Sequence, residues 1–300
     1  MKHIRKLLFI TLLFLALCLV FSILGTAETP DLDASARLSV LHNGEVMTLS
    51  LREYLRGVVA AEMPVTFGPE ALKAQAVAAR TYVLASTRHE NARVCTDSAC
   101  CLAWCDTDAL RAAWGGSFEE NLAAVDAAVA ATDGEYLIYE SAPIQAVFHA
   151  SSGGATESSG AIWSDLPYLQ SVSTPETAEA VPGLVTTVTV PADILAGTLA
   201  LDTQDAPAQW IEAVRRNDAG RVKGVLLGGK AFTGSYLRRA FGLRSTDFDL
   251  VWDGENFLFT VTGHGHGVGL SQYGAKLLAA DGWTYDRILA HYYPGTELVR

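Results

Sequence analysis

The first residue in this sequence that could do chemistry is a glutamate at the predicted end of a helix. Residues 51–61 carry apolar side chains three and four positions apart, as on one face of a helix, and Pro64 ends that segment. Glu62 follows this apolar face, beside Met63, where a carboxyl group would be poorly solvated. Such a group can donate and then accept a proton near neutral pH. On spacing alone, a solvated carboxylate at a helix end is the simpler interpretation.

A second glutamate lies close by in the sequence. Glu70 directly follows Pro69, which stands at a first-turn position of an alanine-rich predicted helix. A negative charge there complements the positive end of the helix dipole. We therefore expect Glu70 to stabilise its helix and not to take part in catalysis.

Polar residues beside glycines occur in two further segments and could bind a ligand. Glycines in residues 148–154 and 265–275 would let the backbone approach a ligand, although both segments could equally be plain turns. His149 and His266 could also be structural histidines, and His264 and His266 alternate as on a strand, which disfavours a metal pair. The candidates for binding substrate are Ser151, Ser152, His266, Ser271, Gln272 and Tyr273.

A cysteine-rich segment has a spacing that suits either a metal or disulfides. His89, Cys95, Cys100 and Cys101 read H-x5-C-x4-C-C, and Cys105 lies beyond them. One imidazole and three thiolates would form a closed tetrahedral zinc site. Outside the cytoplasm, a disulfide of Cys105 with Cys95 or Cys101 is the alternative, whereas a bond between the adjacent Cys100 and Cys101 would be strained. Free thiols are the third possibility.

The composition excludes two classes of protein. Half of the 300 residues are hydrophobic and 18% are charged, which is incompatible with a disordered chain. The 22 basic and 33 acidic residues give a formal net charge of −11. Because nucleic-acid binding draws its affinity from Lys and Arg on phosphates, we expect no nucleic-acid partner.

The first residues predict a membrane segment. Basic residues at positions 2, 3, 5 and 6 precede an apolar run over residues 7–24, long enough to span a bilayer with the basic flank in the cytoplasm. A signal peptide cleaved near residue 27 is the alternative, but the run exceeds the usual signal core of about 7–15 residues. We expect an anchor or signal over 1–27, a linker over 28–37 and an extracytoplasmic domain over 38–300, possibly as two subdomains around a groove.

The predicted elements are mixed in order, which favours an α+β fold over a doubly wound sheet. Asn43 and Gly44 separate two apolar runs within residues 39–49, a strong hairpin signal. We predict helices over 51–61, 70–88, 119–131, 205–215 and 286–293, strands over 136–139, 144–149, 185–190 and 222–227, and a glycine-rich loop over 263–274.

Three ordered sequence blocks resemble the stage II sporulation protein D and amidase enhancer family. The first comprises Val58–Pro64 and Glu70–Tyr82, the second comprises Phe148–Gly154 with Leu166–Leu169, and the third is Gly265–Ala275. The resemblance spans nearly all of the chain after the apolar run. Some clostridial members of the family hold zinc with His and Cys residues at the spacing seen here, with a histidine where Cys100 stands.

The resemblance implies a membrane-anchored lytic transglycosylase that cuts peptidoglycan glycan strands between N-acetylmuramic acid and N-acetylglucosamine during sporulation and engulfment. It assigns catalysis to Glu62 and a structural role to the zinc. Other membrane engulfment proteins and a peptidoglycan amidase are the partners it implies. The amidase enhancers suggest an alternative, in which the same groove binds peptidoglycan without cutting it and stimulates an N-acetylmuramoyl-L-alanine amidase.

Overall fold

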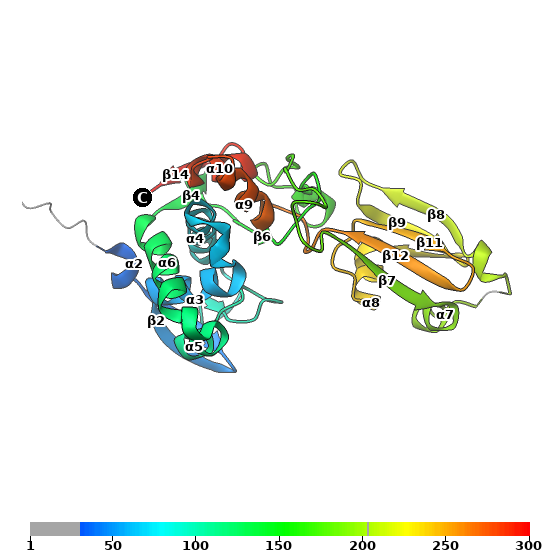
Figure 1. Cartoon of the computed structure of the whole chain (residues 1–300), viewed down its shortest axis with the longest axis horizontal. Helices are drawn as coiled ribbons and strands as arrows, with labels where there is room; N and C mark the ends of the chain where they lie inside the picture. Colours follow the sequence, from blue (N-terminus) through cyan, green and yellow to red (C-terminus); the bar gives the residue numbers. More distant parts are fainter. Residues whose placement is uncertain (1–30, 203) are drawn as a thin grey trace, which may run out of the picture. The chain divides into compact units, whose positions relative to one another are not determined.

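The computed structural model describes residues 31–202 and 204–300, in which helices and short strands are interleaved. The strands form several small sheets, with the orders β2-β1-β3, β10-β9-β8, β11-β12-β7, β14-β4-β5 and β13-β6. Helices and sheets build two hydrophobic cores, one around the helix α4 (Pro69–Ala85) and one around the strand β12 (Asn256–Thr262). The predicted α+β class is confirmed (Figure 1).

The first core begins with the predicted hairpin. Strands β1 (Arg37–His42) and β2 (Glu45–Ser50) pair antiparallel, and Asn43 and Gly44 both take the positive φ that such a tight turn requires. The helix α3 (Leu51–Glu62) starts at once, because Ser50 and Glu53 form a reciprocal capping box. The sequence therefore positions the start of α3 through local interactions alone.

The helix α4 lies at the centre of the first core and contacts α3, α6, α9 and α10 (Figure 1). Its many alanines leave room for these neighbours on several sides, and residues 74–83 are all buried. Arg80 on α4 is 1% exposed and pairs with the equally buried Asp33, whose oxygens lie 3.0 Å from the guanidinium Nε. Since each charge is buried, removing either partner would leave the other uncompensated.

Further helices and strands surround α3 and α4 in this part of the chain. They are α2 (Leu32–Ser35), β3 (Val94–Cys95), α5 (Thr107–Trp114), α6 (Phe118–Ala131), β4 (Tyr136–Tyr139), β5 (Ala142–Pro143), β6 (Phe148–His149), β13 (Leu270–Ser271), α9 (Gln272–Ala280), α10 (Tyr285–Tyr292) and β14 (Glu297–Val299). The parallel pair β6 and β13 joins the second and third sequence blocks directly.

The second core is built on two three-stranded antiparallel sheets. The aromatic rings of Phe248, Phe257 and Phe259 fill its centre, and Trp210 stacks on Phe257. Its elements are β7 (Val185–Pro191), α7 (Ala192–Leu199), β8 (Ile211–Arg216), β9 (Val222–Leu227), β10 (Lys230–Thr233), α8 (Gly234–Ala240), β11 (Phe248–Trp252) and β12.

Three of the predicted elements differ from the structure. The predicted helix over 205–215 is wrong, because a short turn at Pro207–Gln209 leads into β8, which pairs with β9. Pro207 opens this short turn, where proline is tolerated, and pairing with β9 satisfies the backbone of the residues that follow. The predicted strand over 144–149 is reduced to β6, and the loop over 263–274 ends in β13 and the first turns of α9.

The predicted linker is partly folded. Residues 32–37 contain α2 and the start of β1, and the buried side chain of Asp33 reaches Arg80. The compact unit that contains both cores begins at Asp33. The predicted membrane segment over residues 7–24 lies outside the described residues, and within them we find no helix both long and apolar enough to cross a membrane.

Candidate active site

A cavity of about 630 Å³ brings Glu62 together with the cysteine segment and with the second and third sequence blocks. This volume is in the range of small-molecule pockets. Glu62 is its only carboxyl group among the described residues. The lining consists of Glu62, Tyr82, Arg88, Ser98, Ala99, Cys100, Cys101, Leu102, Val147, Phe148, His149, Ala150, Trp163, His264, Gly265, His266 and Gln272.

The carboxyl group of Glu62 is held from two sides. Glu62 is the last residue of α3, and its Oε1 accepts a hydrogen bond of 2.8 Å from the backbone N–H of Ala103. The side chain of Gln272 also bonds to it. Burial raises the pKa of Glu62, and these two hydrogen bonds lower it by less. The position at the negative end of the helix dipole acts in the same direction as burial.

Gln272 is positioned by the start of α9. Ser271 caps this helix through the Gly274 N–H, so the first residue of the helix, Gln272, points into the cavity. Its Nε2 also lies 3.3 Å from Oε1 of Gln75 on α4. Gln272 is thus a predicted ligand-binding residue that the structure brings next to Glu62.

Two histidines of the cavity are uncharged near neutral pH. His149 donates from Nδ1 to the Val268 carbonyl at 3.1 Å, so its Nε2 accepts from the Ser152 hydroxyl. Burial lowers the pKa of His149, and that of His266 to about 4, with nearby arginines acting in the same direction. The Nδ1 atom of His266 accepts from the Val268 N–H at 3.0 Å. Both imidazole rings are therefore neutral, and their hydrogen bonds fix their orientation in the wall of the cavity.

The other predicted binding residues have structural partners and do not line the cavity. Ser151 exchanges backbone hydrogen bonds with His264, and Ser152 bonds to His149. Ser271 donates its hydroxyl to Glu176, and the ring of Tyr273 packs against Phe67. Glu70 bonds to Lys73 and to the Tyr285 N–H, away from the cavity.

Glu176 is a site-organising residue that the sequence analysis did not identify. Its Oε2 accepts from the backbone N–H groups of Ser152 and Gly153, both at 2.6 Å, and its Oε1 accepts from Ser271. These contacts fasten the second block to the start of α9. The residues around position 176 form no local pattern that predicts this role, because the partners of Glu176 lie far away in the sequence.

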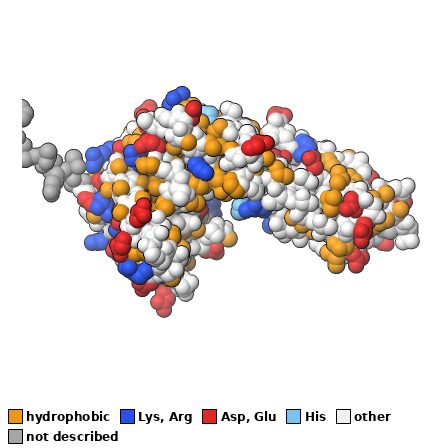
Figure 2. Space-filling view, viewed as in Figure 1, with side chains coloured by type: hydrophobic (Ala, Val, Ile, Leu, Met, Phe, Trp, Pro, Cys, Tyr) orange, Lys and Arg blue, Asp and Glu red, His pale blue; other side chains and the backbone are white. Residues whose placement is uncertain are grey.

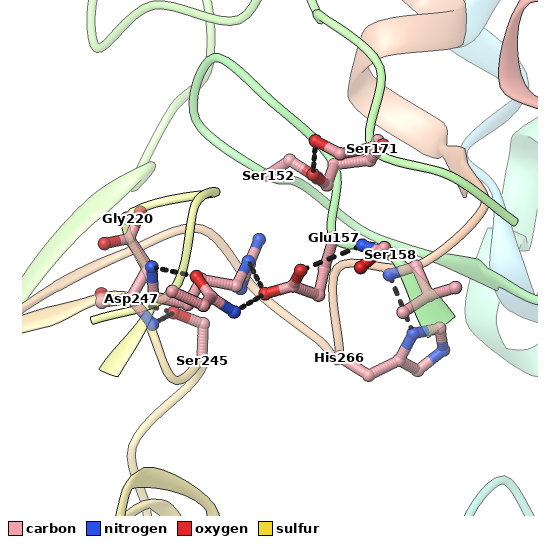
Figure 3. Close-up of polar contacts among 12 residues, drawn as sticks. Ser152, Glu157, Ser158, Ser171, Gly220, Ser245, Asp247 and His266 are labelled. Carbon is pink, nitrogen blue, oxygen red and sulfur yellow. Dashed lines mark hydrogen bonds and ion pairs between the residues drawn. The ribbon is translucent and has the colours of Figure 1, made fainter. Parts of the chain in front are cut away.

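A second buried network supports the loop that carries His266 (Figure 3). The N–H of Glu157 donates to the Gly267 carbonyl, and its Oε2 lies 4.0 Å from the Arg221 Nε and accepts from Asn217. The Arg221 guanidinium fills the space beside Gly267, where a Cβ would lie only 2.4 Å from it. Gly267 also has φ +85°, so this position favours glycine on both grounds.

The cysteine segment forms a compact group of metal ligands. The ligand atoms of His89, Cys95, Cys100 and Cys101 all lie within 4.8 Å of one another. The His89 Nε2 is 3.4 Å from the Cys101 Sγ and 3.7 Å from the Cys100 Sγ, and those two sulfurs are 4.0 Å apart. Tetrahedral zinc with standard bond lengths would place N and S about 3.6 Å apart and two sulfurs about 3.8 Å apart. The four residues therefore fit a metal ion.

The chemistry of these thiols also fits a cation. Burial raises the pKa of the Cys101 thiol to about 12 and that of Cys100 as well, so a thiolate here needs a positive partner. Cys95, Cys100, Cys101 and Cys105 are free of disulfides. Cys105 lies outside the ligand group.

The raised pKa of Glu62 predicts a pH-dependent stability difference between the wild type and Glu62→Gln. The folded wild type binds more protons than its unfolded chain between pH 4.5 and the raised pKa, so its stability falls as pH rises through this window. Glutamine cannot ionise, so the Glu62→Gln protein does not lose this stability as pH rises. Glu62→Gln should be more stable than the wild type at neutral pH, and the difference should shrink towards zero below pH 4.5.

Urea unfolding of both proteins across this pH range measures the difference. Glu119→Gln, which removes an exposed carboxyl group on α6, shows the effect of losing a surface charge. A Glu62→Gln protein that is less stable than the wild type at neutral pH would contradict the expected burial penalty.

On the face seen in Figure 2, acidic and basic side chains are intermingled and form no continuous basic surface. This agrees with the formal net charge of −11.

Comparisons with known proteins identify the family. A family model described as Stage II sporulation protein matches residues 42–139. Stage II sporulation protein D of Bacillus amyloliquefaciens is 38% identical over 264 residues, which cover 85% of this chain and 76% of the relative. The protein of the same name from Bacillus subtilis is 36% identical with the same coverage. The amidase enhancer of Bacillus subtilis is 30% identical over 81% of this chain and 40% of its own length. The chain belongs to the stage II sporulation protein D family.

Proposed function

We propose that this protein is a peptidoglycan lytic transglycosylase that acts in sporulation, with Glu62 as its general acid and base. The observation that carries the proposal is the carboxyl group of Glu62, whose pKa is raised by burial in a cavity large enough for a small ligand. The sporulation proteins among the relatives support the biological setting.

The reaction needs one group that first gives and then takes a proton. Protonated Glu62 donates to the oxygen that links C1 of N-acetylmuramic acid to C4 of N-acetylglucosamine, and the C1–O bond breaks. The C6 hydroxyl of the same muramic acid then bonds to C1 and gives its proton to Glu62. The products are a 1,6-anhydro end and a free C4 hydroxyl, and no water is consumed.

The lining of the cavity favours this route over hydrolysis. A hydrolytic glycosidase uses a second carboxyl group, either to attack the sugar or to activate water. Glu62 is the only carboxyl group among the described residues that line the cavity. Its hydrogen bonds from Ala103 and Gln272 hold the carboxyl group in place through both proton transfers.

Glu62→Gln should abolish formation of 1,6-anhydro ends from purified glycan strands. A general acid and base contributes about 10²–10⁴-fold to the rate, so at least that loss is expected. In the wild type, activity should fall as pH rises above the raised pKa of Glu62, because the first step needs the proton. Mass spectrometry of the products measures both effects.

Glu70→Gln is the matched control, since Glu70 lies outside the cavity and should leave the rate nearly unchanged. Retained activity in purified Glu62→Gln would refute the proposal.

The amidase enhancer relative favours a second candidate function. In that case the cavity would bind glycan strands and the protein would stimulate a separate amidase. Release of stem peptides only when an amidase is added, with no anhydro ends from this protein alone, would establish the enhancer role instead.

We propose further that zinc binds to His89, Cys95, Cys100 and Cys101 and has a structural role. When bound, the ion would cross-link the cysteine segment. Cys101 in this segment lies two residues before Ala103, whose backbone N–H donates a hydrogen bond to Glu62. Four protein ligands leave no open position for water, so the ion supplies stability and no catalytic water.

The zinc proposal predicts about one zinc per chain in protein purified under reducing conditions without added metal. Chelation or Cys101→Ser should lower the Tm by roughly 5 °C or more, since each lost kcal/mol lowers the Tm of a domain of 150–250 residues by about 2–4 °C. Cys105→Ser is the control and should keep the zinc. Elemental analysis and thermal unfolding measure these effects, and metal-free protein of unchanged Tm would contradict the prediction.

We propose that residues 7–24 anchor the protein in the cell membrane, with the folded unit on the extracytoplasmic side. The basic residues before this apolar run set the orientation. The full-length protein should then fractionate with membranes and keep its first residues on N-terminal sequencing. A mature N-terminus near Glu28 would show a cleaved signal peptide instead.

A further inference from the structure

Trp163 differs from the other tryptophans of the chain. It is 51% exposed and packs against neither hydrophobic core. The other five tryptophans all pack against one of the two cores, and they are Trp104, Trp114, Trp210, Trp252 and Trp283. The exposed ring of Trp163 therefore contributes little to core packing.

The backbone that carries Trp163 is nevertheless firmly held. The Trp163 N–H donates to the Ser159 carbonyl at 2.7 Å, and the buried Ser159 hydroxyl accepts from the Leu166 N–H at 2.9 Å. The flanking residues Ile162 and Leu166 pack against the first core. A rigid turn thus displays a large apolar ring to solvent.

The ring of Trp163 lines the same cavity as Glu62. It meets the ring of His266 edge-on, with the centroids 5.1 Å apart and the planes inclined by 61°. His266 is itself fixed by the Val268 N–H, so this contact defines the orientation of the indole. Exposed apolar surface beside a cavity with fixed polar groups is typical of a ligand-binding site.

A sugar ring is the ligand that suits this surface. One face of a pyranose presents C–H groups with partial positive charge, which the negative face of an indole attracts. Hydroxyl and acetamido groups at the edge of the ring need planar polar partners, and Gln272 and Arg88 line the same cavity.

We propose that Trp163 is a stacking platform, on which one pyranose ring of the glycan strand lies. The glycosidic bond next to that ring is then placed at Glu62. This inference rests on the proposed glycan substrate and adds a binding subsite to it. Trp163 acts by binding and positioning the strand, and it takes no part in proton transfer.

Binding is tested in the Glu62→Gln background, where cleavage does not interfere. The probe is a peptide-free tetrasaccharide of alternating N-acetylglucosamine and N-acetylmuramic acid, titrated by calorimetry. Adding Trp163→Ala should raise the Kd about tenfold or more, and Trp163→Phe should restore most of the affinity, because a smaller aromatic face remains. Tyr236→Ala removes an exposed aromatic ring on α8 of the second core and should leave the Kd unchanged.

Activity and stability measurements separate a platform from a structural role. In the active enzyme, Trp163→Ala should raise KM more than it lowers kcat and leave the Tm unchanged. An unaltered Kd in the Trp163→Ala protein, or no binding of the tetrasaccharide by Glu62→Gln, would overturn the proposal. If the tetrasaccharide binds through Trp163 but the wild type forms no anhydro ends, the platform stands and the transglycosylase proposal fails.

Discussion

The site depends on keeping one carboxyl group largely out of water while still supplying it with hydrogen bonds. An isolated buried carboxylate would be too costly to maintain, and a fully solvated one would ionise in the ordinary range. Glu62 lies between these extremes, because burial raises its pKa and two donors, from Ala103 and Gln272, restrain the rise. The end of α3, the cysteine segment and the start of α9 must therefore meet at one point.

Buried acidic side chains elsewhere hold that meeting point together. Glu176 fastens Ser152 and Gly153 to Ser271, so Gln272, the next residue, is placed beside Glu62. Glu157 holds the loop that carries His266 through its backbone N–H, which donates to the Gly267 carbonyl, while its buried carboxylate lies 4.0 Å from the Arg221 Nε. Each of these carboxyl groups accepts hydrogen bonds from backbone or side-chain donors, and these bonds offset the free-energy cost of burying it. The second core takes part through Arg221 on the loop before β9, which packs beside Gly267.

Local patterns predicted the parts of the fold that local interactions determine. The turn at Asn43 and Gly44, the helix α3 and the position of Glu62 at its end all follow from neighbouring residues. The strand β8 was not predicted, because it exists by pairing with β9 and not by its own periodicity. Glu176 and Asp33 were missed for a related reason, since their roles come from partners distant in sequence. Of the predicted binding residues, Gln272 and His266 line the cavity, whereas Ser271 does not and bonds to Glu176 instead.

The cysteine segment links the stability of the site to its chemistry. A carboxyl group with a raised pKa makes the folded state less stable at neutral pH, so the surrounding fold must offset that cost. Cys100 and Cys101 line the cavity directly before Leu102 and Ala103, and the Ala103 N–H reaches Glu62. A cross-link through His89 and the cysteines would fix this donor without adding any group to the reacting sugar. The same short segment then restrains the pKa of Glu62 and forms one wall of the cavity, which explains why it lies beside the catalytic candidate.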